Sequence, residues 1–121
     1  MTKPEKNFGR HILVDFLDCD PEVLKFVDPM REILLRAAKE CKATVMDDLF
    51  HQYEPFGVSG VVLIAESHLS VHTWPEDGFA GLDIFTCGAE MEPEVAVEIM
   101  KREFSAGEAV VKTLVRGQLE T

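Results

Sequence analysis

Apolar and polar residues alternate along several segments of the chain, a pattern typical of strands with one buried face. The clearest such segments are residues 10–18, 43–53, 58–65, 81–87 and 108–115. The stretch A-E-S-H-L-S-V-H-T-W-P-E-D-G, residues 65–78, also reads as a strand that ends in a turn at 75–78. The middle strands are joined by short turns, which predicts that they pair antiparallel.

Two other segments have apolar residues at helical spacing. In M-R-E-I-L-L-R-A-A-K-E-C, residues 30–41, the apolar side chains share one face and the charged ones lie opposite. Residues 92–104, E-P-E-V-A-V-E-I-M-K-R-E-F, predict a second amphipathic helix. The Asp-Pro pairs at 20–21 and 28–29 each offer an N-cap residue followed by proline at the first helical position.

This order of elements predicts one α+β domain over residues 1–121. The order is strand, helix, four strands, helix, strand. Two helices on one face of a mainly antiparallel sheet form a two-layer sandwich. The other face of the sheet then has no helix to cover it, so it must be polar or pack on another copy of the chain.

The charge and the cysteines narrow the class of protein. With 22 acidic and 12 basic residues, the formal net charge is −10, so we expect neither nucleic acid nor an anionic membrane as partner. No apolar run has the length of a membrane span and the first residues contain no apolar leader segment, which favours a cytoplasmic protein. Three cysteines without a C-x-x-C spacing suggest neither a disulfide framework nor a zinc site.

Residues 65–78 contain the densest group of reactive side chains, and three chemistries compete for them. His68 and His72 share one face of a strand and could bind a metal ion, but no motif supplies a third ligand. A Ser-His hydrolase is disfavoured because the chain has no G-x-S-x-G elbow. In the third chemistry, self-cleavage, Ser67 attacks the carbonyl of Glu66, and His72 and Ser59 are the candidates to assist it.

A longer string favours self-cleavage. G-V-S-G-V-V-L-I-A-E-S-H-L-S-V-H-T-W-P-E at 57–76, followed by D-I-F-T-C-G at 83–88, closely resembles the bacterial and archaeal S-adenosylmethionine decarboxylases, which are pyruvoyl enzymes of polyamine synthesis. Further matches are G-R-H at 9–11, C-D-P-E-V-L at 19–24, A-T-V at 43–45 and F-H at 50–51. The resemblance extends over nearly the whole chain and implies the same two-layer fold and a homodimer of cleaved protomers.

The resemblance implies a cleavage site and a cofactor made from the chain itself. Cleavage between Glu66 and Ser67 would produce a β chain of residues 1–66 and an α chain of residues 67–121. Ser67 would become a covalently bound pyruvoyl group, which forms a Schiff base with the substrate amine and accepts electrons as carbon dioxide leaves. His72 resembles the residue that removes the serine α-proton in processing, and Ser59 resembles its helper.

The resemblance also implies residues for turnover and substrate binding. Cys87 resembles the acid that reprotonates the product carbon. Glu76 matches the carboxylate that holds the ribose hydroxyls, and Tyr53 stands where the family usually has a phenylalanine that stacks on adenine. The substrate implied is S-adenosylmethionine, and no metal is implied.

Two segments depart from the family pattern. The family usually reads F-H-R-F-x-P-x-G where this chain has F-H-Q-Y-E-P-F-G, so Gln52 replaces an arginine and Glu54 is an added acid. Asp77 replaces an aromatic residue after H-T-W-P-E. Compared with the family pattern, this chain has one cationic residue fewer and two acidic residues more near the expected pocket. This change would favour a ligand with a guanidinium or ammonium group.

These departures keep alternatives open. A homologous pyruvoyl-dependent arginine or ornithine decarboxylase is the second interpretation, although the retained Glu76 favours a ribose ligand. An inactive regulatory paralogue is the third, and the retention of the serine, histidine and cysteine named above disfavours it.

Overall fold

The computed structural model describes residues 8–87 and 90–117. Residues 1–7, from which the absence of a leader segment was expected, lie outside this description. The strands are β1 (Gly9–Leu17), β2 (Val45–Gln52), β3 (Val58–Ile64), β4 (Ser67–Trp74), β5 (Phe79–Thr86) and β6 (Glu108–Arg116). The helices are α1 (Pro21–Leu24), α2 (Val27–Glu40) and α3 (Pro93–Glu103), with a 3₁₀ helix η1 (Pro75–Asp77).

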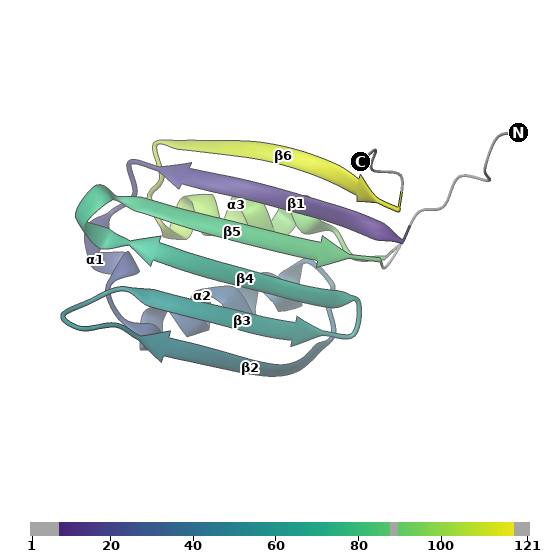
Figure 1. Cartoon of the computed structure of the whole chain (residues 1–121), viewed down its shortest axis with the longest axis horizontal. Helices are drawn as coiled ribbons and strands as arrows, with labels where there is room; N and C mark the ends of the chain where they lie inside the picture. Colours follow the sequence, from purple (N-terminus) through teal and green to yellow (C-terminus); the bar gives the residue numbers. More distant parts are fainter. Residues whose placement is uncertain (1–7, 88–89, 118–121) are drawn as a thin grey trace, which may run out of the picture.

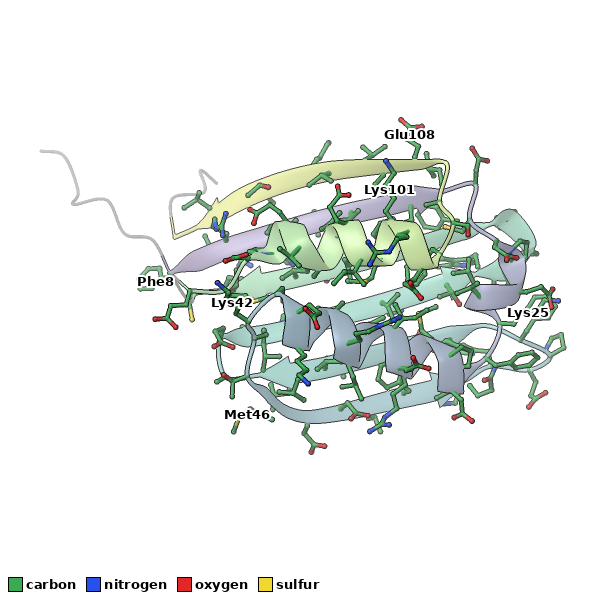
Figure 2. All side chains as sticks on the ribbon, turned by 180° about the vertical axis from the view of Figure 1, so that it is seen from behind. Phe8, Lys25, Lys42, Met46, Lys101 and Glu108 are labelled. Carbon is green, nitrogen blue, oxygen red and sulfur yellow. The ribbon has the colours of Figure 1, made fainter. Side chains whose placement is uncertain are left out.

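The strands form one antiparallel sheet in the order β2-β3-β4-β5-β1-β6 (Figure 1). β1 therefore lies between β5 and β6, which brings the two ends of the described chain together in the sheet. Helices α2 and α3 both cover the same face, as the view from behind shows (Figure 2). The predicted α+β two-layer sandwich, with two helices on one face of an antiparallel sheet, is confirmed.

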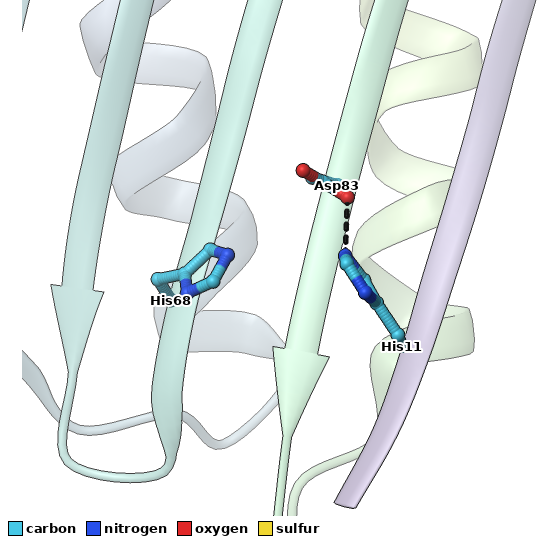
Figure 3. A group of neighbouring side chains, drawn as sticks. All are labelled: His11, His68 and Asp83. Carbon is cyan, nitrogen blue, oxygen red and sulfur yellow. Dashed lines mark hydrogen bonds and ion pairs between the residues drawn. The ribbon is translucent and has the colours of Figure 1, made fainter. Parts of the chain in front are cut away.

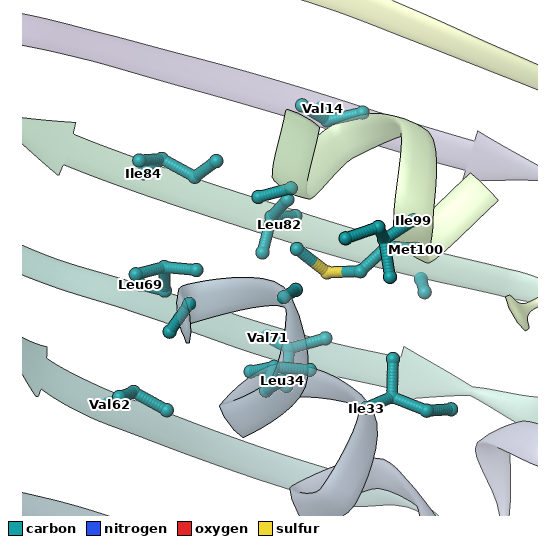
Figure 4. Packing of buried hydrophobic residues seen from close by; sticks show 14 of the residues in the cluster. Val14, Ile33, Leu34, Val62, Leu69, Val71, Leu82, Ile84, Ile99 and Met100 are labelled. Atoms are coloured by element: carbon teal, nitrogen blue, oxygen red, sulfur yellow. The ribbon is translucent and has the colours of Figure 1, made fainter. Parts of the chain in front are cut away.

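Alternate residues of the strands point toward the helices and form the core. Val14, Leu69 and Ile84 of the sheet are buried together with Leu34 of α2 and Met100 of α3 (Figure 4). Burying one such side chain stabilises the fold by about 1.5–3 kcal/mol relative to leaving it in water. The apolar positions expected on the buried face of the first long helix are all buried: Met30, Ile33, Leu34, Ala37 and Cys41.

One of the two predicted helix starts is right and the other is wrong. Asp20 caps α1, and its carboxylate accepts a hydrogen bond of 3.0 Å from the backbone N–H of Glu22. Helix α2, however, begins at Val27, so Asp28 lies inside its first turn and is not the N-cap. The reason is distant in sequence, because the Val27 N–H donates to the side-chain oxygen of Gln52 at 2.8 Å.

The face of the sheet opposite the helices, called the open face below, carries both apolar and reactive side chains. Strand alternation and register place all four histidines of the chain on it: His11, His51, His68 and His72. Its exposed apolar side chains include Leu13, Leu49, Val61, Leu63, Val110 and Leu114. A helix able to span a membrane does not occur within residues 8–87 and 90–117.

Candidate active site

The reactive serine begins a strand directly after a tight turn. Residues 65–66 connect β3 to β4, and Ser67 is the first residue of β4. Its backbone φ is 150°, which lies in a region that residues with a side chain rarely adopt. Holding a non-glycine residue there costs on the order of 1–3 kcal/mol. The peptide bond at which cleavage is expected is therefore part of a strained turn.

The carbonyl that precedes Ser67 has two hydrogen-bond donors, both from one residue. The oxygen of Glu66 accepts from the backbone N–H of Cys87 at 3.1 Å and from its thiol at 3.2 Å. On the other side of the turn, the backbone N–H of Thr44 donates to the Glu66 carboxylate at 3.0 Å. Two donors on one carbonyl form the geometry that stabilises an oxyanion. From the sequence alone Thr44 had no assigned role, since it appeared only within A-T-V at 43–45, a string that matches the family pattern.

A histidine next to Ser67 in the chain is also next to it in space. The Nδ1 atom of His68 lies 3.4 Å from the Ser67 hydroxyl oxygen. From the sequence alone His68 was considered only as a metal ligand. Glu66, Ser67, His68 and Cys87 are called the serine group below.

A second cluster, called the histidine group below, contains Tyr53, Ser59, His72, Trp74 and Glu76. The Ser59 hydroxyl and the His72 Nδ1 atom are 2.8 Å apart, because the two residues are direct partners on β3 and β4. The Tyr53 hydroxyl donates to the Ser59 oxygen at 3.2 Å. The expected contact between His72 and Ser59 is therefore present in the structure.

The histidine group lines a pocket of about 310 Å³. Tyr53 and Trp74 are half-exposed there, and Glu76 contributes a carboxylate. Trp74 was expected only to pack near the turn. Its position beside the P-E pair at 75–76 is the signal that could have identified it as a pocket residue.

The two groups lie toward opposite ends of β4. Ser67 and His72 are five residues apart on that strand, which at a rise of about 3.3 Å per residue is roughly 16 Å. One chain by itself therefore does not bring His72 to Ser67. Cys87, in contrast, directly follows β5 and contacts the Glu66 carbonyl within the same chain.

The residues that depart from the family pattern have structural surroundings of their own. The side-chain N–H groups of Gln52 donate to the carbonyls of Lys25 at 2.8 Å and Gly57 at 3.1 Å, so Gln52 holds two loops together. Glu54 is exposed in the turn after β2. Asp77 lines a different hollow, beside Trp74. Among the described residues, the lining of the histidine-group pocket includes neither of these two acids.

The three cysteines are all free, and their surroundings differ. Burial, with a further contribution from Asp18, raises the pKa of Cys19 to about 11. Burial also raises the pKa of Cys41. Cys87 is exposed at the serine group. It is therefore the thiol that solvent and small molecules can reach.

Comparison with known proteins gives consistent matches. A family model described as S-adenosylmethionine decarboxylase matches residues 10–117. Two similar proteins are named S-adenosylmethionine decarboxylase proenzyme. The one from Thermodesulfovibrio yellowstonii is 45% identical over 109 residues, which cover 90% of this chain and 81% of that protein. The one from Thermococcus gammatolerans is 48% identical over 112 residues, which cover 93% of this chain and 78% of that protein.

A solved structure agrees with the fold. The crystal structure of the adenosylmethionine decarboxylase from Aquifex aeolicus superposes with a TM-score of 0.87 at 34% sequence identity, with 96% of each chain covered. Residues 10–117, which the family model matches, include both the serine group and the histidine group.

Proposed function

The chain belongs to the S-adenosylmethionine decarboxylase family, and from this we propose that it is a pyruvoyl-dependent S-adenosylmethionine decarboxylase that makes its own pyruvoyl group. Its product would be the aminopropyl donor for polyamine synthesis, in particular of spermidine. The observation that carries the proposal is the Glu66 carbonyl, which accepts two hydrogen bonds from Cys87 next to a strained Ser67. The cytoplasmic location expected from the sequence stays a prediction.

Self-cleavage would begin with an acyl shift at the strained turn. The Ser67 hydroxyl oxygen attacks the carbonyl carbon of Glu66 and loses its proton to His68 Nδ1, its neighbour at 3.4 Å. Negative charge develops on the Glu66 oxygen, where the N–H and thiol of Cys87 stabilise it. The C–N bond then breaks, the proton moves to the departing amine, and an ester joins residues 66 and 67.

The ester would then be broken by elimination. A base removes the α-proton of residue 67, and the bond from its Cβ to the ester oxygen breaks, which releases residues 1–66 with a new carboxylate. The remaining enamine becomes an imine, water adds to it, and ammonia leaves. Residues 67–121 then begin with a pyruvoyl group. We assign the base to His72, whose ring is oriented by Ser59 at 2.8 Å.

This assignment requires a second copy of the chain. His72 is roughly 16 Å along the strand from Ser67 in the same chain, so the His72 that serves Ser67 would belong to a partner. Two copies packed through their open faces about a two-fold axis can place the serine group of each against the histidine group of the other, which forms two equal sites. The same contact would cover exposed Leu49 and Leu63, and such apolar surface is typical of interfaces. We therefore propose a homodimer.

The histidine-group pocket suits an adenosyl sulfonium substrate. The Glu76 carboxylate can accept hydrogen bonds from both ribose hydroxyls, and the faces of Tyr53 and Trp74 can stack on a base or attract a sulfonium cation. The pyruvoyl group supplies the carbonyl that accepts electrons when carbon dioxide leaves. Cys87, the exposed thiol, then donates a proton to the product carbon.

Labelled substrates test the proposal directly. The purified protein is incubated separately with carboxyl-labelled S-adenosylmethionine, arginine and ornithine, and released carbon dioxide is counted. We expect release from S-adenosylmethionine alone, together with two chains in a denaturing gel. Ser67→Ala should remain one chain and release nothing, whereas the control Ser105→Ala, just after α3, should behave as the wild type.

Two results would contradict the proposal. Release from arginine or ornithine alone would overturn the substrate and leave the pyruvoyl chemistry. A wild-type chain that stays uncleaved and inactive would overturn the enzyme and favour a regulatory subunit.

A further inference from the structure

A cluster on the open face has the composition of a metal site. We propose that His11, His68 and Asp83 bind one first-row divalent cation of the zinc class. One possible ligand atom from each of the three residues lies within 4.8 Å of the other two, and the side chains turn toward one another (Figure 3). The site is separate from the pocket of the histidine group.

Three neighbouring strands hold these ligands in place. His11 on β1 and His68 on β4 are the direct partners of Phe85 on β5, one from each side. Asp83 is two residues before Phe85, so it lies on the same face. Both histidine rings contact the Phe85 ring, with centroids 5.6 and 6.1 Å away. The three proposed ligands therefore lie on hydrogen-bonded strands and not on loops.

The carboxylate has the support that metal ligands usually have. One Asp83 oxygen lies 2.6 Å from His11 Nε2, and the Ser70 hydroxyl donates to the other at 3.3 Å. The Ser70 hydrogen bond would orient the Asp83 carboxylate as a ligand. The His11–Asp83 contact joins two of the proposed ligands, so Zn²⁺ would replace the proton between them. The side chains of His11 and Asp83 are only 21% and 35% exposed, so water competes less well for them than at an open surface.

The donor set selects the class of metal. Two imidazole nitrogens and one carboxylate oxygen, with a further position left for water, suit Zn²⁺ and its first-row neighbours. Mg²⁺ and Ca²⁺ prefer oxygen ligands throughout. Tetrahedral Zn²⁺ needs its donor atoms about 3.3 Å apart, so small side-chain rotations from the present positions would complete the site.

His68 would connect this site to the proposed self-cleavage, and this step rests on the proposed function. The Nδ1 atom of His68 faces the Ser67 hydroxyl at 3.4 Å, which leaves Nε2 for the metal. With Zn²⁺ on Nε2, the ring keeps a proton on Nδ1 and cannot accept the hydroxyl proton of Ser67. Bound Zn²⁺ should therefore slow cleavage.

Calorimetric titration of ZnCl₂ into the purified chain tests the site. We expect one ion per chain, and at least about tenfold weaker binding in His11→Gln and in Asp83→Asn, a range known from altered metal sites. His51→Gln is the matched control, since His51 is an exposed histidine on the same face. Cys87→Ser should bind as the wild type does, which excludes the exposed thiol as the ligand.

The outcomes are distinct. Circular dichroism is used to check that each variant is folded. Asp83→Asn is chosen because an amide has nearly the same shape as a carboxylate. Unchanged Zn²⁺ affinity in both His11→Gln and Asp83→Asn, or an equal loss in His51→Gln, would overturn the site.

A second experiment follows cleavage of the newly translated chain with and without ZnCl₂. We expect Zn²⁺ to slow cleavage of the wild type and to have no effect on His11→Gln. Equal rates in the wild type would overturn the connection to Ser67 and leave the decarboxylase proposal intact. A chain that binds Zn²⁺ but never cleaves would overturn the decarboxylase proposal and keep the metal site.

Discussion

At the scale of single residues, Cys87 has two separable parts. Its backbone N–H and its thiol both donate to the Glu66 carbonyl, at 3.1 and 3.2 Å. The family resemblance implied a role for the thiol only in turnover. The structure adds a contact between the thiol and the carbonyl that Ser67 would attack, so we propose that the same side chain also assists processing.

Two substitutions at Cys87 should separate these roles. Cys87→Ala removes one of two donors from the developing oxyanion and should slow self-cleavage on the order of 10²-fold. Cys87→Ser keeps a donor, so it should cleave at close to the wild-type rate and then decarboxylate slowly, because a hydroxyl is a poorer acid than a thiol. Mass spectrometry over time measures cleavage, and labelled carbon dioxide measures turnover. Equal cleavage rates in both variants would show that the thiol contact has no effect.

At the scale of elements, the start of α2 depends on a side chain from another element. Phe26, its N-cap residue, provides no side-chain cap, and the Val27 N–H is satisfied by Gln52 at the end of β2. Gln52 also holds the carbonyls of Lys25 and Gly57. A residue that looked like a change in substrate recognition therefore has a structural role.

Removing this amide should destabilise the fold. Gln52→Ala leaves the Val27 N–H without its acceptor and removes one of the hydrogen bonds that the Lys25 and Gly57 carbonyls each accept. This loss should lower the free energy of unfolding by about 1–3 kcal/mol. Urea denaturation measures the change. Glu54→Gln, two residues away and exposed, should stay within about 0.5 kcal/mol of the wild type. Equal stability of Gln52→Ala and the wild type would contradict this account.

At the scale of the whole molecule, β4 separates the two reactive groups. Ser67 pairs with residues 64 and 86 near one end of the sheet, and His72 pairs with residues 59 and 81 toward the other end. The open face between them carries exposed apolar side chains and all four histidines. In the proposed homodimer, a second copy would cover that face and complete both sites.

Coexpression of two inactive variants tests this arrangement. Ser67→Ala and His72→Ala should each stay uncleaved alone. In a mixed dimer, the Ser67→Ala chain supplies His72 to the intact Ser67 of the other chain, so we expect cleavage of the His72→Ala chain only. Tags of different mass identify which chain is cut. A chain with both substitutions is the control, since its mixture with either single variant should give no cleavage.

The sequence by itself determined the strands, the two long helices and the fold class, because the periodicity of burial is local and can be read from neighbouring residues. It also determined where the reactive stretch lies, since 57–76 form one continuous string. Asp20 caps its helix through a residue two positions away, and such a contact is visible in the sequence.

Only the tertiary structure decided contacts between distant segments. The start of α2 depends on a residue 25 positions away, and Asp83 meets His11 across 72 positions. It likewise separated Ser67 from His72, which are near in sequence, because an extended strand moves residues apart at about 3.3 Å each. Strand pairing and helix docking set these distances, and both depend on the packing of the whole sheet.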